Sequence, residues 1–193
     1  MELQFIGTDH EVTGSCHYLQ VGNKNILIDC GMRQGSIKYE NVDLPVPASK
    51  IDFVIVTHAH IDHSGMLPKL YKDGFRGQVA ATEATASLCD IMLRDSAHIQ
   101  TMEAEWKNKR EKRSGSEQDV EPVYSMEDAM NLIRLIAPYS YGKIYTLCDG
   151  VRFRFTDIGH LLGSSSVELW LTEGRTEKKI VFSGDIGNKD QPL

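Results

Sequence analysis

The sequence predicts an α/β fold in which β-sheets and helices form separate layers. Two groups of short β-type runs bracket a pair of helix-type segments, which is the pattern of a layered α/β domain. Residues 51–57 form an apolar run rich in β-branched side chains, as expected of a strand buried on both faces. A length of 193 residues suits one domain with a substantial core. We therefore expect helices to cover at least one sheet face.

The first part of the chain alternates apolar runs with glycine-containing turns. Three of these runs are expected to be strands: residues 3–6, 16–21 and 25–29. Pro45 and Pro47 make residues 31–50 a long irregular connection before the strand at residues 51–57.

The middle of the chain carries the helix signals. A short helix is expected over residues 63–71, ended by Gly74, before a strand at residues 79–81. The longest helical pattern covers residues 83–113, with Thr82 as candidate N-cap. Its apolar side chains approximate one stripe, which predicts the face packed on the core: Leu88, Ile91, Met92, Ile99, Met102 and Trp106.

The last part of the chain combines one helix with further strands. After a polar loop at residues 114–123, Ser125 and Asp128 form a variant of the capping box, which opens a helix to about residue 137. Four strands are expected to follow: residues 143–147, 151–156, 167–171 and 179–182. Asp149-Gly150 and Glu173-Gly174 predict hairpin turns between them.

The composition excludes several classes of protein. Hydrophobic residues make up 41% and charged residues 25% of the chain, which argues against disorder and fibrous repeats. The net charge of −6 argues against a simple phosphate-binding module, which is usually basic. No apolar run approaches the roughly 20 residues of a membrane span and no signal-peptide pattern is present, so we expect no membrane partner. The scattered cysteines predict reduced thiols in a cytoplasmic protein: Cys16, Cys30, Cys89 and Cys148.

The strongest chemical signal is the segment THAHIDHSG, residues 57–65, directly after the buried strand. Side chains two residues apart on an extended segment point the same way, so His58 and His60 can share one metal. A turn then lets Asp62 and His63 face a second metal position about 3.5–4 Å away. Imidazole and carboxylate are ligand types that Zn²⁺ accepts. The alternative is a hydrogen-bonded polar turn that caps the next helix, but four potential ligands in six residues favour a metal centre.

Two later loops carry residues of the same kind. His160 follows a strand and lies between Gly159 and Gly163, and Asp185 follows another strand and Gly184. Either residue alone is more often a turn former. Together with the histidine-rich segment, they would supply a third imidazole and a carboxylate that bridges two metals.

These residues lead to a family. The order HxHxDH, His160 and Asp185 resembles the metallo-β-lactamase superfamily, and Asp29, in the run ILIDCG, matches that family's first motif. The flanking segments look like the β-CASP branch of RNA-processing nucleases: EVTGSC at 11–16, GHLLGS at 159–164 and FSGD at 182–185. Ser165 stands where most relatives have alanine, which is also small. The resemblance covers essentially the whole chain and implies an αββα sandwich.

The resemblance also implies a di-zinc centre and its chemistry. The ligands would be His58, His60 and His160 at the first Zn²⁺, Asp62 and His63 at the second, and Asp185 as the bridge. Asp29 would accept hydrogen bonds that orient the histidine-rich loop. The implied reaction is hydrolysis of RNA phosphodiesters by metal-bound hydroxide, endo- or 5′-exonucleolytic, with Asp62 orienting the water and accepting its proton.

Further motifs of the β-CASP branch have no counterpart in residues 1–193. In that branch an inserted cap domain follows, and a returning segment supplies another histidine to the second metal. We therefore expect residues 1–193 to be the N-terminal portion of a metallo-β-lactamase domain, without the β-CASP cap and the C-terminal return. Such a portion is expected to be nearly inactive alone, to have an incomplete second metal site, and to self-associate through exposed apolar surface.

The substrate has less support in the sequence. Residues 107–113 hold five basic side chains and one acidic side chain, a pattern more typical of a solvated helix end than of a nucleic-acid contact. RNA is the expected substrate through the resemblance, with single-stranded DNA as an alternative.

Three other functions stay open. The first is another hydrolase of the same fold, acting on a thioester, a lactam or a small phosphodiester. The second is a non-catalytic scaffold of an RNA-processing complex, which need not retain zinc. The third is a diiron protein, since similar ligand sets can hold iron.

Overall fold

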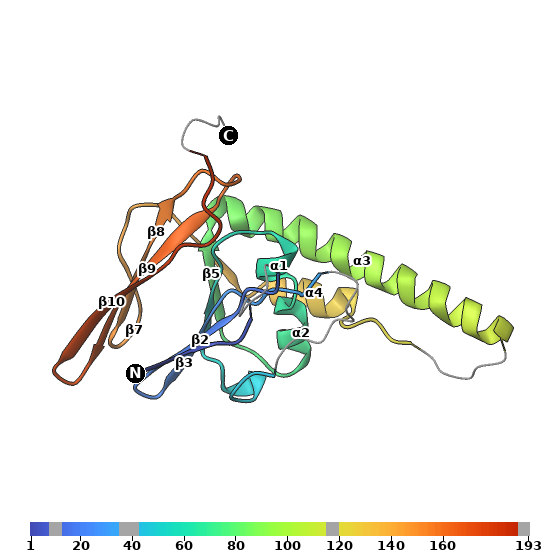
Figure 1. Cartoon of the computed structure of the whole chain (residues 1–193), viewed down its shortest axis with the longest axis horizontal. Helices are drawn as coiled ribbons and strands as arrows, with labels where there is room; N and C mark the ends of the chain where they lie inside the picture. Colours follow the sequence, from blue (N-terminus) through green and yellow to red (C-terminus); the bar gives the residue numbers. More distant parts are fainter. Residues whose placement is uncertain (8–12, 35–42, 115–119, 189–193) are drawn as a thin grey trace.

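Two β-sheets and one layer of helices are stacked in the computed structural model, which describes residues 1–7, 13–34, 43–114 and 120–188 (Figure 1). The first sheet has six strands in the order β1 to β6: Glu2–Phe5, His17–Val21, Lys24–Ile28, Phe53–Ile55, Gln78–Thr82 and Ile136–Tyr139. Its first three strands are antiparallel, and β3 to β6 are parallel. The predicted α/β class is confirmed.

The second sheet is antiparallel, in the order β10-β9-β8-β7. Its strands are β7 Tyr145–Cys148, β8 Val151–Asp157, β9 Ser165–Glu173 and β10 Thr176–Phe182. The predicted hairpin turns are confirmed, because Gly150 lies between β7 and β8 and Gly174 between β9 and β10 with positive φ angles of 78° and 60°. Turns of this kind favour glycine at such angles.

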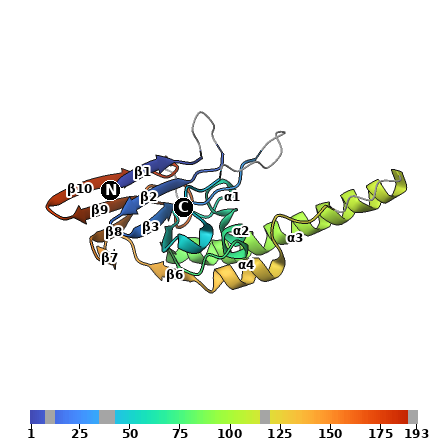
Figure 2. The same cartoon turned by 90° about the horizontal axis from the view of Figure 1, so that it is seen from below.

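The helices are α1 Ile61–Ser64, α2 Leu67–Lys72, α3 Glu83–Ser114 and α4 Met126–Ile133, with a 3-10 turn η1 at Ala48–Lys50. The helical layer packs on the first sheet, opposite the second sheet (Figure 2). Within the described residues, the outer face of the second sheet carries no helix. None of the described helices combines the length and apolar character needed to cross a bilayer.

Strand alternation produces two separate cores on the first sheet. Leu27 and Val54 point to the helices, whereas their neighbours Ile26, Ile28 and Ile55 point to the second sheet. All five are fully buried. A sheet covered on both faces needs apolar side chains at every position, which explains the near-continuous runs in its central strands.

Three predicted element boundaries are wrong. The helix expected over residues 125–137 ends at Ile133, and the edge strand β6 follows it. Pro138 lies in β6, where the missing N–H is tolerated because an edge strand pairs on one side only. The short helix expected over residues 63–71 is two helices, since the N–H of Met66 bonds the carbonyl of Cys30 and Pro68 starts a new helix. The strand expected over residues 51–57 is shorter, since β4 covers only Phe53–Ile55.

The prediction of which face of the long helix packs on the core is also wrong. The long helix α3 begins as expected, with the Thr82 hydroxyl accepting from the N–H of Thr85. However, four of the six stripe residues are exposed: Ile91, Ile99, Met102 and Trp106. The buried face instead carries Cys89, Leu93, Ala97 and Ala104, and α3 extends well beyond the sheets (Figure 1).

The buried and exposed faces of α3 predict that substitutions on the two faces change the free energy of unfolding by different amounts. Leu93→Ala is expected to lower the free energy of unfolding by about 2–5 kcal/mol, because it leaves a cavity in the core. Ile91→Gln is expected to change it by less than about 0.5 kcal/mol, because that side chain is already in solvent. Urea denaturation of both variants measures the difference, and a comparable loss for Ile91→Gln would show that the stripe is covered.

Charged side chains pair on the outer face of the second sheet. The carboxylate of Glu168 accepts hydrogen bonds from Lys179 (2.5 Å), from Arg154 (2.6 and 2.8 Å) and from the hydroxyl of Thr156 (2.9 Å). The hydrogen bond from Lys179, followed by those from Arg154 and Thr156, outweighs burial and lowers the pKa of Glu168 to about 2. Exposed apolar side chains are most frequent on α3, where Ile91, Ile99, Met102 and Trp106 lie, and self-association stays a prediction.

Glu168→Gln is expected to destabilise the chain by about 1–2 kcal/mol at pH 7. The folded pKa lies below the ordinary value, so the stabilisation is fully present above about pH 4.5 and is lost as the pH falls toward 2. Urea titrations at pH 7 and pH 2.5 should therefore give a large and a small difference between wild type and variant. Glu177→Gln, which removes one contact of 3.4 Å, is the matched control. Equal differences at both pH values would contradict the assignment.

Candidate metal centre

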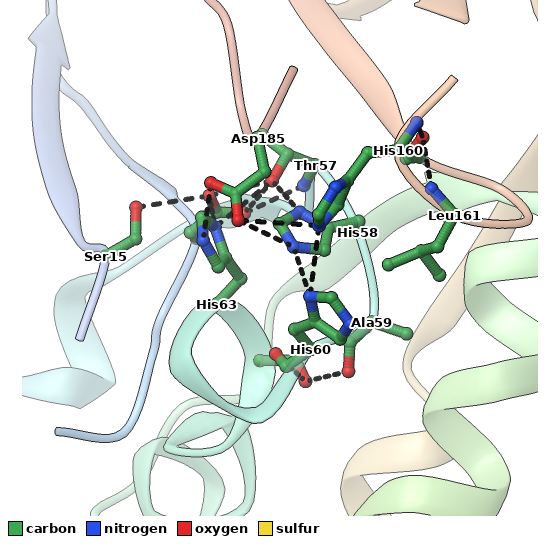
Figure 3. A network of polar contacts seen from close by, with 12 residues as sticks. Ser15, Thr57, His58, Ala59, His60, His63, His160, Leu161 and Asp185 are labelled. Atoms are coloured by element: carbon green, nitrogen blue, oxygen red, sulfur yellow. Dashed lines mark hydrogen bonds and ion pairs between the residues drawn. The ribbon is translucent and has the colours of Figure 1, made fainter. Parts of the chain in front are cut away.

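The predicted site residues come from four separate segments that meet at one edge of the two sheets (Figure 3). Asp29 directly follows β3, and His58 and His60 lie in the loop after β4. His63 is in α1. His160 lies in the loop between β8 and β9, and Asp185 lies just after β10. All four segments follow the ends of strands at the same edge, which brings distant residues together.

Three histidines point their ring nitrogens at one another. Nε2 of His58 lies 3.1 Å from Nδ1 of His60, and Nε2 of His160 lies 3.3 Å from the same Nδ1. The carboxylate of Asp185 lies 3.5 Å from Nε2 of His160 and 3.8 Å from Nε2 of His58. One ligand atom from each of the four residues fits within 4.8 Å of the others. The group is therefore compact enough to surround one cation.

Burial keeps the first two histidines neutral. Burial, and then the charge of His63, lowers the pKa of His58 to about 3. Burial, and then the charge of His160, also lowers the pKa of His60 below its ordinary value. Neutral imidazoles facing each other at about 3 Å present lone pairs that need a proton or a cation between them. This donor set therefore fits a metal ion.

The carboxylate of Asp29 organises the base of the site. It is 1% exposed and accepts from the N–H of Thr57 (2.8 Å), the hydroxyl of Thr57 (2.9 Å), Nδ1 of His63 (2.8 Å) and the hydroxyl of Ser15 (3.3 Å). Its backbone has φ = 60°, the left-handed region that aspartate tolerates better than most residues. The sharp change of direction after β3 aims the carboxylate at the loop after β4.

Thr57 links the carboxylate of Asp29 to the ring of His58. Its hydroxyl has one proton, which is donated to Asp29, so it accepts from the Nδ1–H of His58 at 3.0 Å. The tautomer assigned in this way leaves the Nε2 lone pair of His58 facing His60. A hydrogen bond of this kind at the distal nitrogen is a common way for proteins to orient a metal-binding histidine.

A second part of the site lies around His63. Its Nδ1 bonds Asp29, and its Nε2 faces a carboxylate oxygen of Asp185 at 3.3 Å. Burial lowers the pKa of His63, but the hydrogen bond to Asp29 and the charges of Asp29, Asp185 and Asp62 outweigh it, so the pKa is raised. Asp62 lies outside the four-residue group, yet its charge also raises the pKa of His60. Asp185 thus lies between the two parts of the site.

Side-chain hydroxyl groups hold the backbone of the His160 loop at both of its ends. The Ser164 hydroxyl accepts from the N–H groups of His160 and Leu161. The carbonyl of Gly163 accepts from the hydroxyls of Thr82 and Thr85 at 2.7 and 2.8 Å. Gly163 has φ = 88°, and a Cβ there would lie 2.5 Å from the N–H nitrogen of Thr85, so glycine is required for this approach.

The roles of several supporting residues were not predicted, although three of them lie within the quoted motifs. Thr57, Ser15 and Ser164 orient the site through hydrogen bonds, but isolated hydroxyl residues carry no spacing signal. His17 is a further histidine at the same edge, and its Nδ1 is buried with no hydrogen-bond partner within the described part of the chain. In the EVTGSC motif at 11–16, residues 11 and 12 lie outside the described part of the chain.

The fold and the site together define a class: a layered two-sheet α/β domain with a histidine-rich metal-type site at its strand ends. Residues 11–191 match the model of the Metallo-beta-lactamase superfamily. The chain belongs to the metallo-β-lactamase superfamily, as predicted from its motifs.

Related proteins of known name are much longer than this chain. Ribonuclease TTHA0252 of Thermus thermophilus is 35% identical over the whole chain, which spans 39% of that protein. Transcription termination factor FttA of Methanococcus maripaludis is 30% identical over 94% of the chain, which spans 27% of that protein. The chain therefore corresponds to the minor part of both relatives.

Solved structures support the fold alone. A metallo-β-lactamase variant from Cronobacter sakazakii aligns with 99% of this chain and 64% of its own length, with a TM-score of 0.60 and 21% identity. The subclass B3 metallo-β-lactamase MEM-A1 from a soil metagenome aligns with 93% of this chain and 59% of its own length, with a TM-score of 0.56 and 15% identity.

Proposed function

We propose that this chain carries the metal centre of a zinc-dependent phosphodiester hydrolase that cleaves RNA, in the β-CASP branch of the superfamily. The observation that carries the proposal is the convergence of His58, His60, His160 and Asp185 on one point. The substrate class is supported by the names of the two relatives, a ribonuclease and a transcription termination factor.

The donor geometry suits zinc. Four ligands arranged tetrahedrally at Zn–N distances of about 2.0–2.1 Å have nitrogen atoms about 3.3–3.4 Å apart. The two ring-nitrogen separations at His60 are 3.1 and 3.3 Å. We propose His58, His60 and His160 as ligands of the first Zn²⁺, Asp62 and His63 as ligands of the second, and Asp185 as the group between them.

In this proposal the bound metal and the protein side chains have different roles. Bound zinc supplies a water nucleophile at neutral pH and polarises the phosphoryl oxygens. Asp29 and Thr57 hold His58 and His63 in the tautomers that present Nε2 to the site. Asp62 would orient the attacking water and accept its proton at a carboxylate oxygen. We also propose a cytoplasmic location, which the four unpaired cysteines support.

Metal removal from the intact protein tests the proposal. Dialysis against a chelator is expected to abolish cleavage of labelled RNA, and added Zn²⁺ is expected to restore it. His160→Ala should lower zinc content, whereas His98→Ala, at an exposed histidine of α3, should not.

Three results would favour the alternatives. Cleavage that is insensitive to chelation would exclude the metal-dependent mechanism. Hydrolysis of a thioester or β-lactam without cleavage of RNA would keep the fold and change the substrate. A protein that purifies without zinc and cleaves no substrate would support the scaffold.

A further inference from the structure

Three aromatic rings form a row beside the candidate metal centre. The ring of Phe5, at the end of β1, meets the ring of His17, at the start of β2, edge-on, with centroids 5.4 Å apart and an interplanar angle of 82°. His17 stacks in turn on Phe182, at the end of β10, with centroids 5.3 Å apart and an angle of 28°. Phe182 is buried, but Phe5 is 65% exposed.

These rings line the same cavity as the second part of the site. A cavity of about 390 Å³ is bordered by Phe5, His17 and Phe182 on one side, and Asp29, His63 and Asp185 also line it. Its volume lies in the range of small-ligand sites. The aromatic row therefore borders the space next to the metal positions that Asp185 and His63 would hold, where the nucleotide beside a reacting phosphate would lie.

The exposure of Phe5 is not explained by packing. Leu3, two residues earlier on the same strand face, packs into the core between the sheets. Phe5 lies on this same face but at the end of the strand, where the cavity begins. Its ring is held by His17 while most of its surface is exposed at the mouth of the cavity, where a second flat ring can contact it.

We propose that the exposed ring of Phe5, held edge-on by His17, is a stacking platform for the nucleobase next to the cleaved phosphodiester. This inference rests on the proposed RNA hydrolase function and adds a base-binding subsite to it. The charged side chains that line the cavity, Asp29 and Asp185, belong to the metal centre. The platform therefore recognises a base by its flat face and discriminates little between sequences.

Abasic RNA substrates test the platform in the intact protein. A series of RNA oligonucleotides, each with one abasic nucleotide, is cleaved by wild type and by Phe5→Ala. For wild type, kcat/KM is expected to fall roughly 5- to 150-fold when the abasic nucleotide lies at one position beside the cleavage site. Phe5→Ala should show a similar loss on intact RNA and no further loss at that position. Phe5→Trp should restore cleavage, and Phe5→Leu should not.

Binding gives a readout that does not depend on cleavage. With 2-aminopurine at the sensitive position of a non-hydrolysable RNA, stacking should quench its fluorescence with wild type and not with Phe5→Ala. Ile91→Ala, at an equally exposed apolar residue on α3, is the matched control. Thermal unfolding of each variant checks that the fold is intact.

The outcomes separate the platform from the function on which it rests. If RNA is cleaved in a zinc-dependent way but Phe5→Ala loses nothing, or loses equally on every abasic substrate, the platform is overturned and the hydrolase stands. If thermal stability falls in Phe5→Ala with no change in kcat/KM, Phe5 is a packing residue. If neither wild type nor any variant cleaves RNA, the proposed function is wrong. In that case 2-aminopurine is placed at each position in turn: quenching that is lost in Phe5→Ala supports the base subsite, and quenching that is unchanged overturns it.

Discussion

Asp29→Ala is expected to lower the affinity of the protein for zinc by about 10- to 100-fold, although Asp29 is not itself a proposed zinc ligand. The carboxylate holds the N–H and hydroxyl of Thr57 and Nδ1 of His63, so its removal frees the tautomers and ring orientations of His58 and His63. Zinc titration with a competing fluorescent chelator measures the change.

The same variant is expected to lower the free energy of unfolding by about 3–5 kcal/mol. Removing a buried acceptor leaves its donors unsatisfied, and alanine is strained at the left-handed backbone angle of this position. Asp29→Asn tolerates that angle, so it should lose less stability while still lowering zinc affinity, because an amide accepts at one oxygen only.

Asp52 is a matched control for this experiment. Its carboxylate also accepts two short hydrogen bonds, of 2.9 Å from Lys24 and 2.9 Å from the N–H of Asn25, but next to the opposite ends of the strands. Asp52→Ala should lose some stability and leave zinc affinity unchanged. If it weakens zinc binding as much as Asp29→Ala does, the effect is general destabilisation, and the orienting role of Asp29 is wrong.

The location of the candidate site could be predicted because its signal is local. His58, His60, Asp62 and His63 lie within six residues after a strand, so any strand-to-helix turn brings them near one another. His160 and Asp185 each follow a strand, and strands of a layered α/β fold present their ends at a shared edge. The structure does bring His160 and Asp185 to the histidine-rich loop, whereas which residues bind metal remains a proposal.

The features that could not be predicted depend on contacts between distant segments. The α3 helix has apolar side chains on two faces, and the sequence alone does not reveal that small residues such as Ala97 and Ala104 pack while Ile91 and Trp106 stay in solvent. The aromatic row requires the ends of β1, β2 and β10 to meet. His17 lies 12 residues after Phe5, and Phe182 lies 165 residues after His17, so no spacing pattern in the sequence connects the three rings.

Asp185→Asn is expected to have the largest effect on activity of the intact protein. The Asp185 carboxylate lies 3.3 Å from Nε2 of His63 and 3.5 Å from Nε2 of His160, so both proposed zinc positions depend on its charge. Losing several kcal/mol of transition-state stabilisation by one metal corresponds to a fall in kcat/KM of about 10³-fold or more. The asparagine keeps the size of the side chain, so the free energy of unfolding should change little by comparison.

Zinc content distinguishes the roles that Asp185 could have. If the carboxylate joins two zinc ions, metal analysis should show that Asp185→Asn loses one zinc per chain and retains the ion held by His58, His60 and His160. Asp149→Asn, in the exposed turn between β7 and β8, should retain full zinc content and activity. Unchanged zinc content together with unchanged kcat/KM in Asp185→Asn would mean that the carboxylate only pairs with protonated histidines, and the di-zinc proposal would have to be abandoned.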